Sequence, residues 1–377
     1  MSSDIKIITE LPRDEYTEII YDDICFGQPI NAMDPEDVTK GINRAIELDE
    51  QSGFLEGVSE RLRQLGIDCT PGDTEIMLAE IRRRYKDILG FPCPRTVQEW
   101  IKGTTPGFTN RRNNYDLCYA LGMDFRQTVE FFQKKYLTLP FIVKSKEDAV
   151  FMYCLYHKKP YSKVRELLDR SEDFTVLADT HTSTSQIAQT ILKEDDDEKF
   201  LRYLSQHCYG KEQQFRLAKS IINRELETTH KYIIRDRPCK ASTPDRLNSF
   251  TIEELLGYNY QTIDKKSADR KLPKRFTSSL PNDVTLGRIV NGEAVSYELL
   301  RKTLMLLKFY NFYHDADNKD PMMIGSNLMD FYDELNASLA SCGFAQIYEC
   351  HPFDCLLLYC ANSELPIETL HLVSERN

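Results

Sequence analysis

The sequence predicts an all-α protein, or one nearly so, built from several helical parts. Apolar residues recur at the three- and four-residue spacing of helices along most of the chain, as at Leu55, Val58, Leu62 and Leu65. Capping residues and glycine or proline stops separate these stretches. With 41% hydrophobic and 28% charged residues, the 377-residue chain has the composition of a folded protein and room for two or three domains.

Residues 1–53 are predicted to form an acidic N-terminal segment. The first fifty residues carry thirteen acids against four basic residues, a net charge of −9. Asp34 followed by Pro35 marks a helix start, because an acidic cap and a proline at the first helical position both suit a helix N-terminus. The charge leads to the hypothesis that this segment packs against basic residues downstream and masks them.

Residues 54–140 are predicted to form a domain with a short central helix. A longer helix over 74–89 ends at Gly90, and the central helix over 95–102 ends at Gly103. Within the central helix Val97, Trp100 and Ile101 share one face, which predicts that the only tryptophan is buried. Outward residues are Arg95, Gln98, Glu99 and Lys102.

Residues 141–228 are predicted to form an array of short helices. Ser145 caps the first of them, with Asp148 three residues later in a capping-box-like position. Pro160 and the serines and threonines at 182–185 separate the later ones. No fixed repeat period links these helices, so the sequence indicates no named solenoid family.

The remainder of the chain is predicted to contain a hinge and a C-terminal domain. Residues 229–284 contain a polar stretch with two prolines at 235–246, a basic stretch at 264–275 and, between them, one short helix over 250–258. Residues 285–377 are predicted to be helical around the apolar stretch 297–313, with a short strand at 345–348.

Charge is distributed unevenly along the chain. The whole protein has a formal charge of −11, yet residues 81–112 hold eight basic residues against Asp87 and Glu99, a net charge of +6. An acidic protein does not steer towards phosphate over long distances, but a local basic face still binds it. The other interpretation is that the basic run is the solvated side of a helix.

A weaker copy of the central helix occurs 189 positions later. Thr285-Leu286-Gly287-Arg288-Ile289-Val290-Asn291-Gly292 aligns with residues 96–103 and keeps the apolar stripe and the final glycine. Two interpretations stay open: an internal repeat, or chance similarity between two helix–glycine–helix segments.

The pattern Arg95-Thr96-Val97-x-x-Trp100-x-x-Gly103-x-x-Pro106, followed by Leu117-Cys118-x-Ala120-Leu121-Gly122, resembles the Cro/repressor-type (XRE-like) helix-turn-helix. The resemblance covers residues 54–131 and is degenerate. The preceding helix is long, the turn at 90–94 is longer by about a residue, and Glu99 lies on the face that would meet DNA.

The resemblance implies a cytosolic DNA-binding regulatory protein. Arg95, Gln98 and Lys102 would approach the bases of double-stranded DNA. The residues that would hold phosphates are Arg83, Arg84, Arg111 and Arg112. The alternative is a helical adaptor whose module binds other proteins and no longer binds DNA; the overall charge and Glu99 favour it.

Other functional classes find no support in the sequence. Phosphate-binding, dinucleotide and nucleophile-elbow patterns are absent, so we expect no enzyme and no cofactor. The cysteines and His351 between 342 and 360 are spaced too widely for a typical zinc site, which predicts core cysteines and no metal. No apolar run of eighteen residues and no signal peptide occur, so we expect a cytoplasmic protein without membrane contact. The oligomeric state is not indicated.

Overall fold

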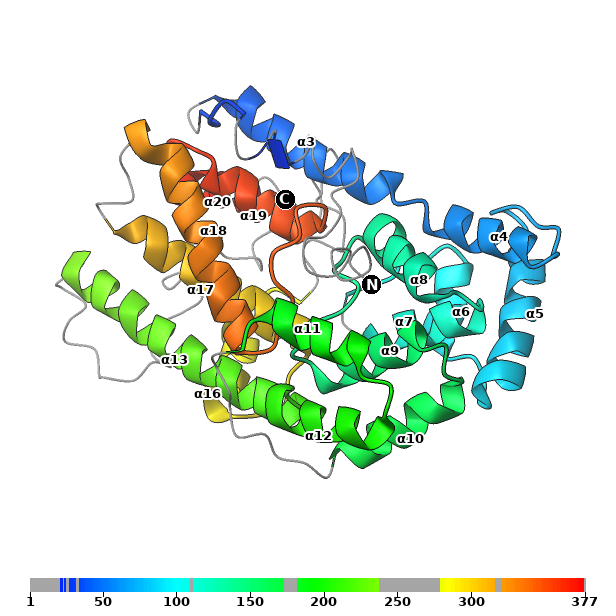
Figure 1. The fold of residues 1–377 in the computed structure, drawn as a ribbon. Helices are drawn as coiled ribbons and strands as arrows, with labels where there is room; N and C mark the ends of the chain where they lie inside the picture. Colours follow the sequence, from blue (N-terminus) through cyan, green and yellow to red (C-terminus); the bar gives the residue numbers. More distant parts are fainter. Residues whose placement is uncertain are drawn as a thin grey trace. The chain divides into compact units, whose positions relative to one another are not determined.

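The protein is all-α in the part that the structure describes, as the sequence predicts. The computed structural model describes residues 21–22, 24, 27–31, 34–108, 111–172, 182–236, 279–315 and 321–375. These residues form sixteen α-helices and no strand, with two isolated β-bridges (Figure 1). Among them, no helix is both long enough and apolar enough to cross a bilayer.

The chain divides into two compact units, which are described separately. Among the described residues, the first unit comprises 50–211 and 343–345. The second comprises the segments up to residue 49 together with 212–342 and 346–375.

The first unit is a succession of helices joined by short turns. They are α4 (Phe54–Gln64), α5 (Thr74–Arg84), α6 (Arg95–Ile101), α7 (Arg111–Ala120), α8 (Phe125–Phe131), α9 (Lys146–Tyr156), α10 (Tyr161–Glu172), α11 (Thr184–Lys193) and α12 (Asp197–His207). Two of them, α5 and α8, end in a wider π-helical turn, at Tyr85–Leu89 and Phe132–Tyr136 respectively. Short connections keep consecutive helices adjacent, so that α9 packs on α10 and α5 on α6.

Glycines end two helices at the predicted positions. Gly90 follows the π-turn of α5 with φ 78°, and Gly103 follows α6 with φ 103°. This left-handed backbone favours glycine because a Cβ atom would clash there. Gly90 therefore sets the start of the segment that precedes α6, and Gly103 sets the start of the segment that follows it.

Trp100 lies in the core of the first unit, as its position on α6 predicts. Its side chain is buried together with Val97 and Ile101. The indole ring meets the rings of Phe54 and Tyr136 edge-on, each at a centroid distance of 6.2 Å. The tryptophan therefore anchors α6 to α4 and to the end of α8, and leaves the opposite side of α6 outward.

The second unit is organised around one long buried helix. Its helices are α3 (Pro35–Gln51), which the Asp34 side chain caps, α13 (Lys211–Asp236), α16 (Asp283–Asn291), α17 (Tyr297–His314), α18 (Ile324–Ser341), α19 (Pro352–Ala361) and α20 (Pro366–Glu375), with a 3₁₀ turn at Pro321–Met323. Helix α17 is buried along most of its length, which confirms its predicted central place. The last two residues of α3, at 50–51, and the first residue of α13, Lys211, belong to the first unit.

Helix α13 continues past residue 228, where the sequence predicts that a hinge begins. Residues 237–278 of that predicted hinge, with its short helix at 250–258, lie outside the described residues. The N-terminal twenty residues of the predicted acidic segment lie outside them as well.

The predicted strand at 345–348 is wrong. These residues run from α18 to α19 as irregular chain. Their amide groups bond to side chains instead of to a neighbouring strand: Ile347 N donates to Asn336 Oδ1 at 2.7 Å, and Tyr348 N donates to Asp354 Oδ2 at 3.0 Å. Because these acceptors satisfy the buried amides, the segment needs no strand partner.

Replacing Trp100 with alanine is expected to lower the free energy of unfolding by about 3–5 kcal/mol, because a large side chain leaves a cavity between α6, α4 and α8. Urea denaturation followed by far-ultraviolet circular dichroism measures this change. Arg95→Ala on the same helix is the matched control and is expected to change it by less than about 0.5 kcal/mol. Equal effects of the two variants would contradict the core position of Trp100.

Candidate nucleic-acid interface

Gln98 joins the turn and the two helices that resemble a helix-turn-helix. Its Oε1 atom accepts hydrogen bonds from Arg82 Nε at 3.1 Å and Nη2 at 2.5 Å, and Arg82 lies on α5. Its Nε2 atom donates to the carbonyl oxygen of Cys93, in the turn before α6, at 2.7 Å. The predicted base-contacting amide is therefore bonded at both ends, and its first role is to hold α6 against α5.

Arg95, Gln98 and Lys102 line one side of α6. They are spaced by three and four residues, so their side chains are neighbours on the helix surface. Arg95 is exposed and makes no hydrogen bond or ion pair with another described residue. Lys102 is exposed too, but its Nζ atom lies 3.1 Å from Glu99 Oε1. Glu99 points outward on the same helix and therefore partly offsets the positive charge of Lys102.

Two further basic residues, which were not among the predicted site residues, come from α5 and from the π-turn that follows it: Arg82 and Lys86. Arg82 reaches Gln98, and Lys86 follows Arg82 by four residues, about one turn along the helix. Both are exposed. Their four-residue spacing inside the basic run is the sequence signal that could have identified them. We call Arg82, Lys86, Arg95, Gln98 and Lys102 the α5–α6 basic face.

Arg83 and Arg84, the other two arginines of α5, form bonds within the protein. Arg83 pairs with Glu80 at 2.6 Å and with Asp87 at 3.0 Å, on its own helix and the π-turn that follows. Arg84 donates from Nε to the carbonyl oxygen of Ala120, at the last residue of α7. Arg61 of α4 donates to the next two carbonyl groups, so two arginines bind the end of α7, where the helix dipole favours cations.

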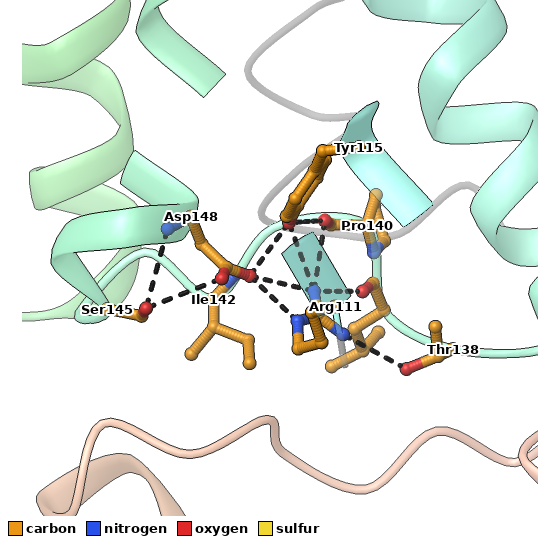
Figure 2. Close-up of polar contacts among 8 residues, drawn as sticks. Arg111, Tyr115, Thr138, Pro140, Ile142, Ser145 and Asp148 are labelled. Atoms are coloured by element: carbon orange, nitrogen blue, oxygen red, sulfur yellow. Dashed lines mark hydrogen bonds and ion pairs between the residues drawn. The ribbon is translucent and has the colours of Figure 1, made fainter. Parts of the chain in front are cut away.

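Arg111, at the start of α7, bonds to the loop before α9 and to Asp148 (Figure 2). Its side chain is 9% exposed and pairs with the buried carboxylate of Asp148 at 2.7 Å. Its Nη2 atom also donates to the carbonyl oxygens of Leu139 and Pro140, and Nη1 donates to Thr138 Oγ1. The guanidinium therefore ties α7 to the loop before α9 and to α9 itself.

Asp148 collects the remaining bonds of this cluster. Its Oδ2 atom accepts from both Arg111 Nε and Nη2, from the hydroxyl of Tyr115 and from the amide of Ile142 (Figure 2). Its own amide donates to the side chain of Ser145, the cap of α9. The predicted cap is thus confirmed, and the buried charge is fully used inside the protein.

Arg112 contacts a second buried carboxylate. Its Nε atom lies 3.6 Å from Asp116 Oδ1 and its Nη1 atom 3.5 Å from Glu147 Oε1. The hydroxyl of Tyr161 donates to Asp116 Oδ1 at 2.7 Å. Burial raises the pKa of Asp116 to about 6, although the bond from Tyr161 and the charge of Arg112 act in the opposite direction.

The structure thus separates the seven predicted site residues into two groups. Arg95, Gln98 and Lys102 are brought together on α6, and Arg83 is exposed on α5. The other three place their guanidinium groups against carbonyl oxygens or buried acids: Arg84, Arg111 and Arg112. Of the seven predicted residues, the exposed basic ones therefore lie on α5 or on α6 with its C-terminal cap.

In the described part of the chain, no side chains are assembled into a metal site or into a reactive-thiol site. Its nine described cysteines are buried and form no disulfide. Among the described residues, no group of three or more histidine, cysteine, aspartate or glutamate side chains could hold a metal ion. Burial raises the pKa of the Cys360 thiol to about 12, and that of the Cys154 thiol also to about 12, which disfavours the reactive thiolate.

Comparisons of the chain with known protein families, with curated proteins and with solved structures find no match.

Replacing Asp116 with asparagine is expected to make the protein more stable than the parent at neutral pH. A folded carboxyl with a raised pKa binds its proton more tightly than the unfolded one, so the parent loses stability as pH rises from about 4 to about 6. Asparagine still accepts the bond from Tyr161 and has no such loss.

Urea denaturation of both proteins at pH 4 and pH 7 measures the effect. The difference in free energy of unfolding is expected to move in favour of Asp116→Asn by about 2 kcal/mol between these pH values. A difference that stays constant with pH would show that Asp116 titrates normally in the folded protein.

Proposed function

We propose that the protein is a DNA-binding regulator that contacts double-stranded DNA through the α5–α6 basic face. One observation carries the proposal: Arg82 of α5 meets the side of α6 on which Arg95 and Lys102 lie. Arg82, Arg95 and Lys102 thereby share one outward side of a helix–turn–helix pair whose opposite side is anchored by the buried Trp100. The exposed Lys86 follows Arg82 by four residues. Such an arrangement suits a helix that enters the major groove while its partner approaches the backbone.

The side chains of this face take different roles in the proposal. Arg95 stands at the start of α6 and has its guanidinium free of other described residues, so it is the principal contact to a base edge or phosphate. Arg82 and Lys86 contact phosphates. Gln98 acts as a positioning residue, because both ends of its amide hold α6 in place. Lys102 contributes less, because Glu99 shares its charge.

Arg84, Arg111 and Arg112 are left out of the proposed contact set. Their donors already bind the end of α7, the loop before α9 and the buried acids. Moving any of them to a phosphate would leave buried acceptors without partners, at a cost comparable to several hydrogen bonds. Arg83 is exposed but balanced by Glu80 and Asp87, so it makes at most a peripheral phosphate contact.

A second candidate is a helical adaptor that binds another protein through the same face. The pairing of Lys102 with Glu99, and of Arg83 with two acids, favours this candidate because it reduces the positive charge available to phosphates. An acidic protein of net charge −11 also repels DNA at long range.

Equilibrium binding of the full chain to a labelled random-sequence duplex tests the proposal. Binding at low salt is expected to weaken steeply as salt rises, because each phosphate contact releases counterions. The double variant Arg82→Ala/Arg95→Ala is expected to reduce the slope of log K against log salt by about 2, one for each contact removed. Fluorescence anisotropy over a salt titration measures both quantities.

Arg202→Ala provides the matched control, because Arg202 is an exposed arginine on α12, outside the proposed face. It is expected to leave affinity and salt slope unchanged. No binding at micromolar protein and low salt would favour the adaptor. Equal losses for the control and the double variant would show that binding does not use the α5–α6 basic face.

A further inference from the structure

The second unit contains a buried arginine–aspartate pair like that of the first. Arg301 of α17 bonds to Asp354 of α19 through two parallel contacts, Nη1 to Oδ1 at 2.8 Å and Nη2 to Oδ2 at 2.6 Å. Both side chains are almost fully buried. Arg301 Nη2 also donates to the carbonyl oxygen of Gln346, and the amide of Tyr348 donates to Asp354 Oδ2. We call this cluster and that of Arg111 and Asp148 the two clasps.

In both clasps, the residues that bond to the arginine or to the aspartate precede the aspartate by the same numbers of residues. The residue three before it, Ser145 or His351, caps the helix by accepting the amide of the aspartate. The residue six before it donates its amide to Oδ2, and the residue eight before it offers its carbonyl oxygen to the arginine. The amide of the cap bonds to the carbonyl of the residue six before the aspartate, at 2.8 Å in both.

The agreement extends into the flanking chain. Eleven residues before the aspartate stands a residue with left-handed backbone, Leu137 with φ 54° or Gly343 with φ 68°. Tyrosine and cysteine follow the aspartate by five and six residues in both clasps, and a proline follows by twelve. A left-handed leucine is unusual, because its Cβ atom is strained there, so this shared position is specific.

The residue after each clasp arginine is also a cation that lies over an aromatic ring, although the two rings stand at different positions relative to the aspartate. Arg112 lies over the ring of Phe151 at 5.5 Å, and Lys302 lies over the ring of Phe353 at 4.7 Å. Around the clasps the helices follow in the same order, α6 to α10 and α16 to α20, with α9 packed on α10 and α19 packed on α20. Gly103 and Gly292 end the first helix of each set with left-handed backbone.

We propose that helices α6–α10 and α16–α20 are two copies of one helical module, each locked by its clasp, and that only the first copy carries the DNA contact. The second statement rests on the proposed function; the first does not. At the positions of Arg95, Gln98 and Lys102 the second copy has Val284, Gly287 and Asn291. The one arginine of α16, Arg288, pairs with Glu293 at 3.2 Å.

The comparison of copies also assigns Arg111 to the fold. Both copies have an arginine at this position, Arg111 and Arg301, and each bonds to the equivalent backbone carbonyl. This arginine therefore stabilises the module that the copies share. Arg95 and Lys102 are exposed and are replaced by other residues in the second copy. They therefore belong to the DNA contact that is proposed for the first copy alone. The second copy therefore acts as a structural companion without a phosphate-binding surface on α16.

Thermal unfolding of lysine variants of the full chain tests the two-copy statement. Arg111→Lys and Arg301→Lys are both expected to lower the melting temperature, by on the order of 5 °C or more, because lysine cannot reproduce the forked bonds. Arg112→Lys is the matched control on the adjacent residue. It is expected to shift the melting temperature by less than about 2 °C, because the second copy has a lysine there.

A parent-like melting temperature for either clasp variant would overturn the two-copy statement, and so would an Arg112→Lys shift as large as that of Arg111→Lys. Amide hydrogen exchange in the unmodified chain is a second measurement that needs no stable variant. Ile142 and Tyr348 are both expected to exchange slowly, because each donates its amide to a buried carboxylate. Fast exchange at one of them alone would overturn the equivalence.

Duplex binding tests the second statement. Arg95→Glu is expected to reduce affinity at least tenfold, and Val284→Glu to leave it unchanged. Loss of affinity with Val284→Glu, at parent-like melting temperature, would show that the second copy contacts DNA as well. If the parent chain binds no duplex, the proposed function fails, whereas the melting and exchange results still decide whether the module is repeated.

Discussion

The ion pair between Arg111 and Asp148 is the contact on which the arrangement of the first unit depends most. One carboxylate oxygen accepts four donors, from α7 and from the loop before α9, and so fixes how those elements meet. Removing either partner would leave a buried charge without compensation, which is far more costly than the pair is favourable. The cluster therefore specifies one packing of helices, and the same solution recurs at Arg301 and Asp354 in the second unit.

Because several arginines bond within the protein, fewer basic side chains of residues 81–112 remain to bind a ligand. The eight basic residues between 81 and 112 suggest a broad phosphate-binding surface. In the folded protein three of them bind carbonyl oxygens or buried acids, and two more face acids at the surface. The positive charge that remains for the proposed DNA contact is concentrated at Arg82, Lys86 and Arg95, beside a helix held in place by Gln98.

Local features were predictable from the sequence because they depend on neighbouring residues. Helix periodicity, the glycine stops at 90 and 103, and the buried side of α6 follow from spacing alone. The partners of Arg84 and Arg111 were not predictable, because they lie far away in the chain: Arg111 and Asp148 are separated by 37 residues. The irregular chain at 345–348 was missed for a different reason: its amides bond to the side chains of Asn336 and Asp354 on the flanking helices, and spacing does not show such side-chain acceptors.

A double-mutant cycle on Arg111→Met and Asp148→Leu tests the central role of the clasp most directly. Each single variant is expected to lower the free energy of unfolding by about 3–5 kcal/mol, because it leaves the other charge buried. The double variant is expected to recover at least about 2 kcal/mol relative to the sum of the single losses, as for side chains that act as one unit. Strictly additive losses would contradict the account, because they would mean that the two residues stabilise the fold independently.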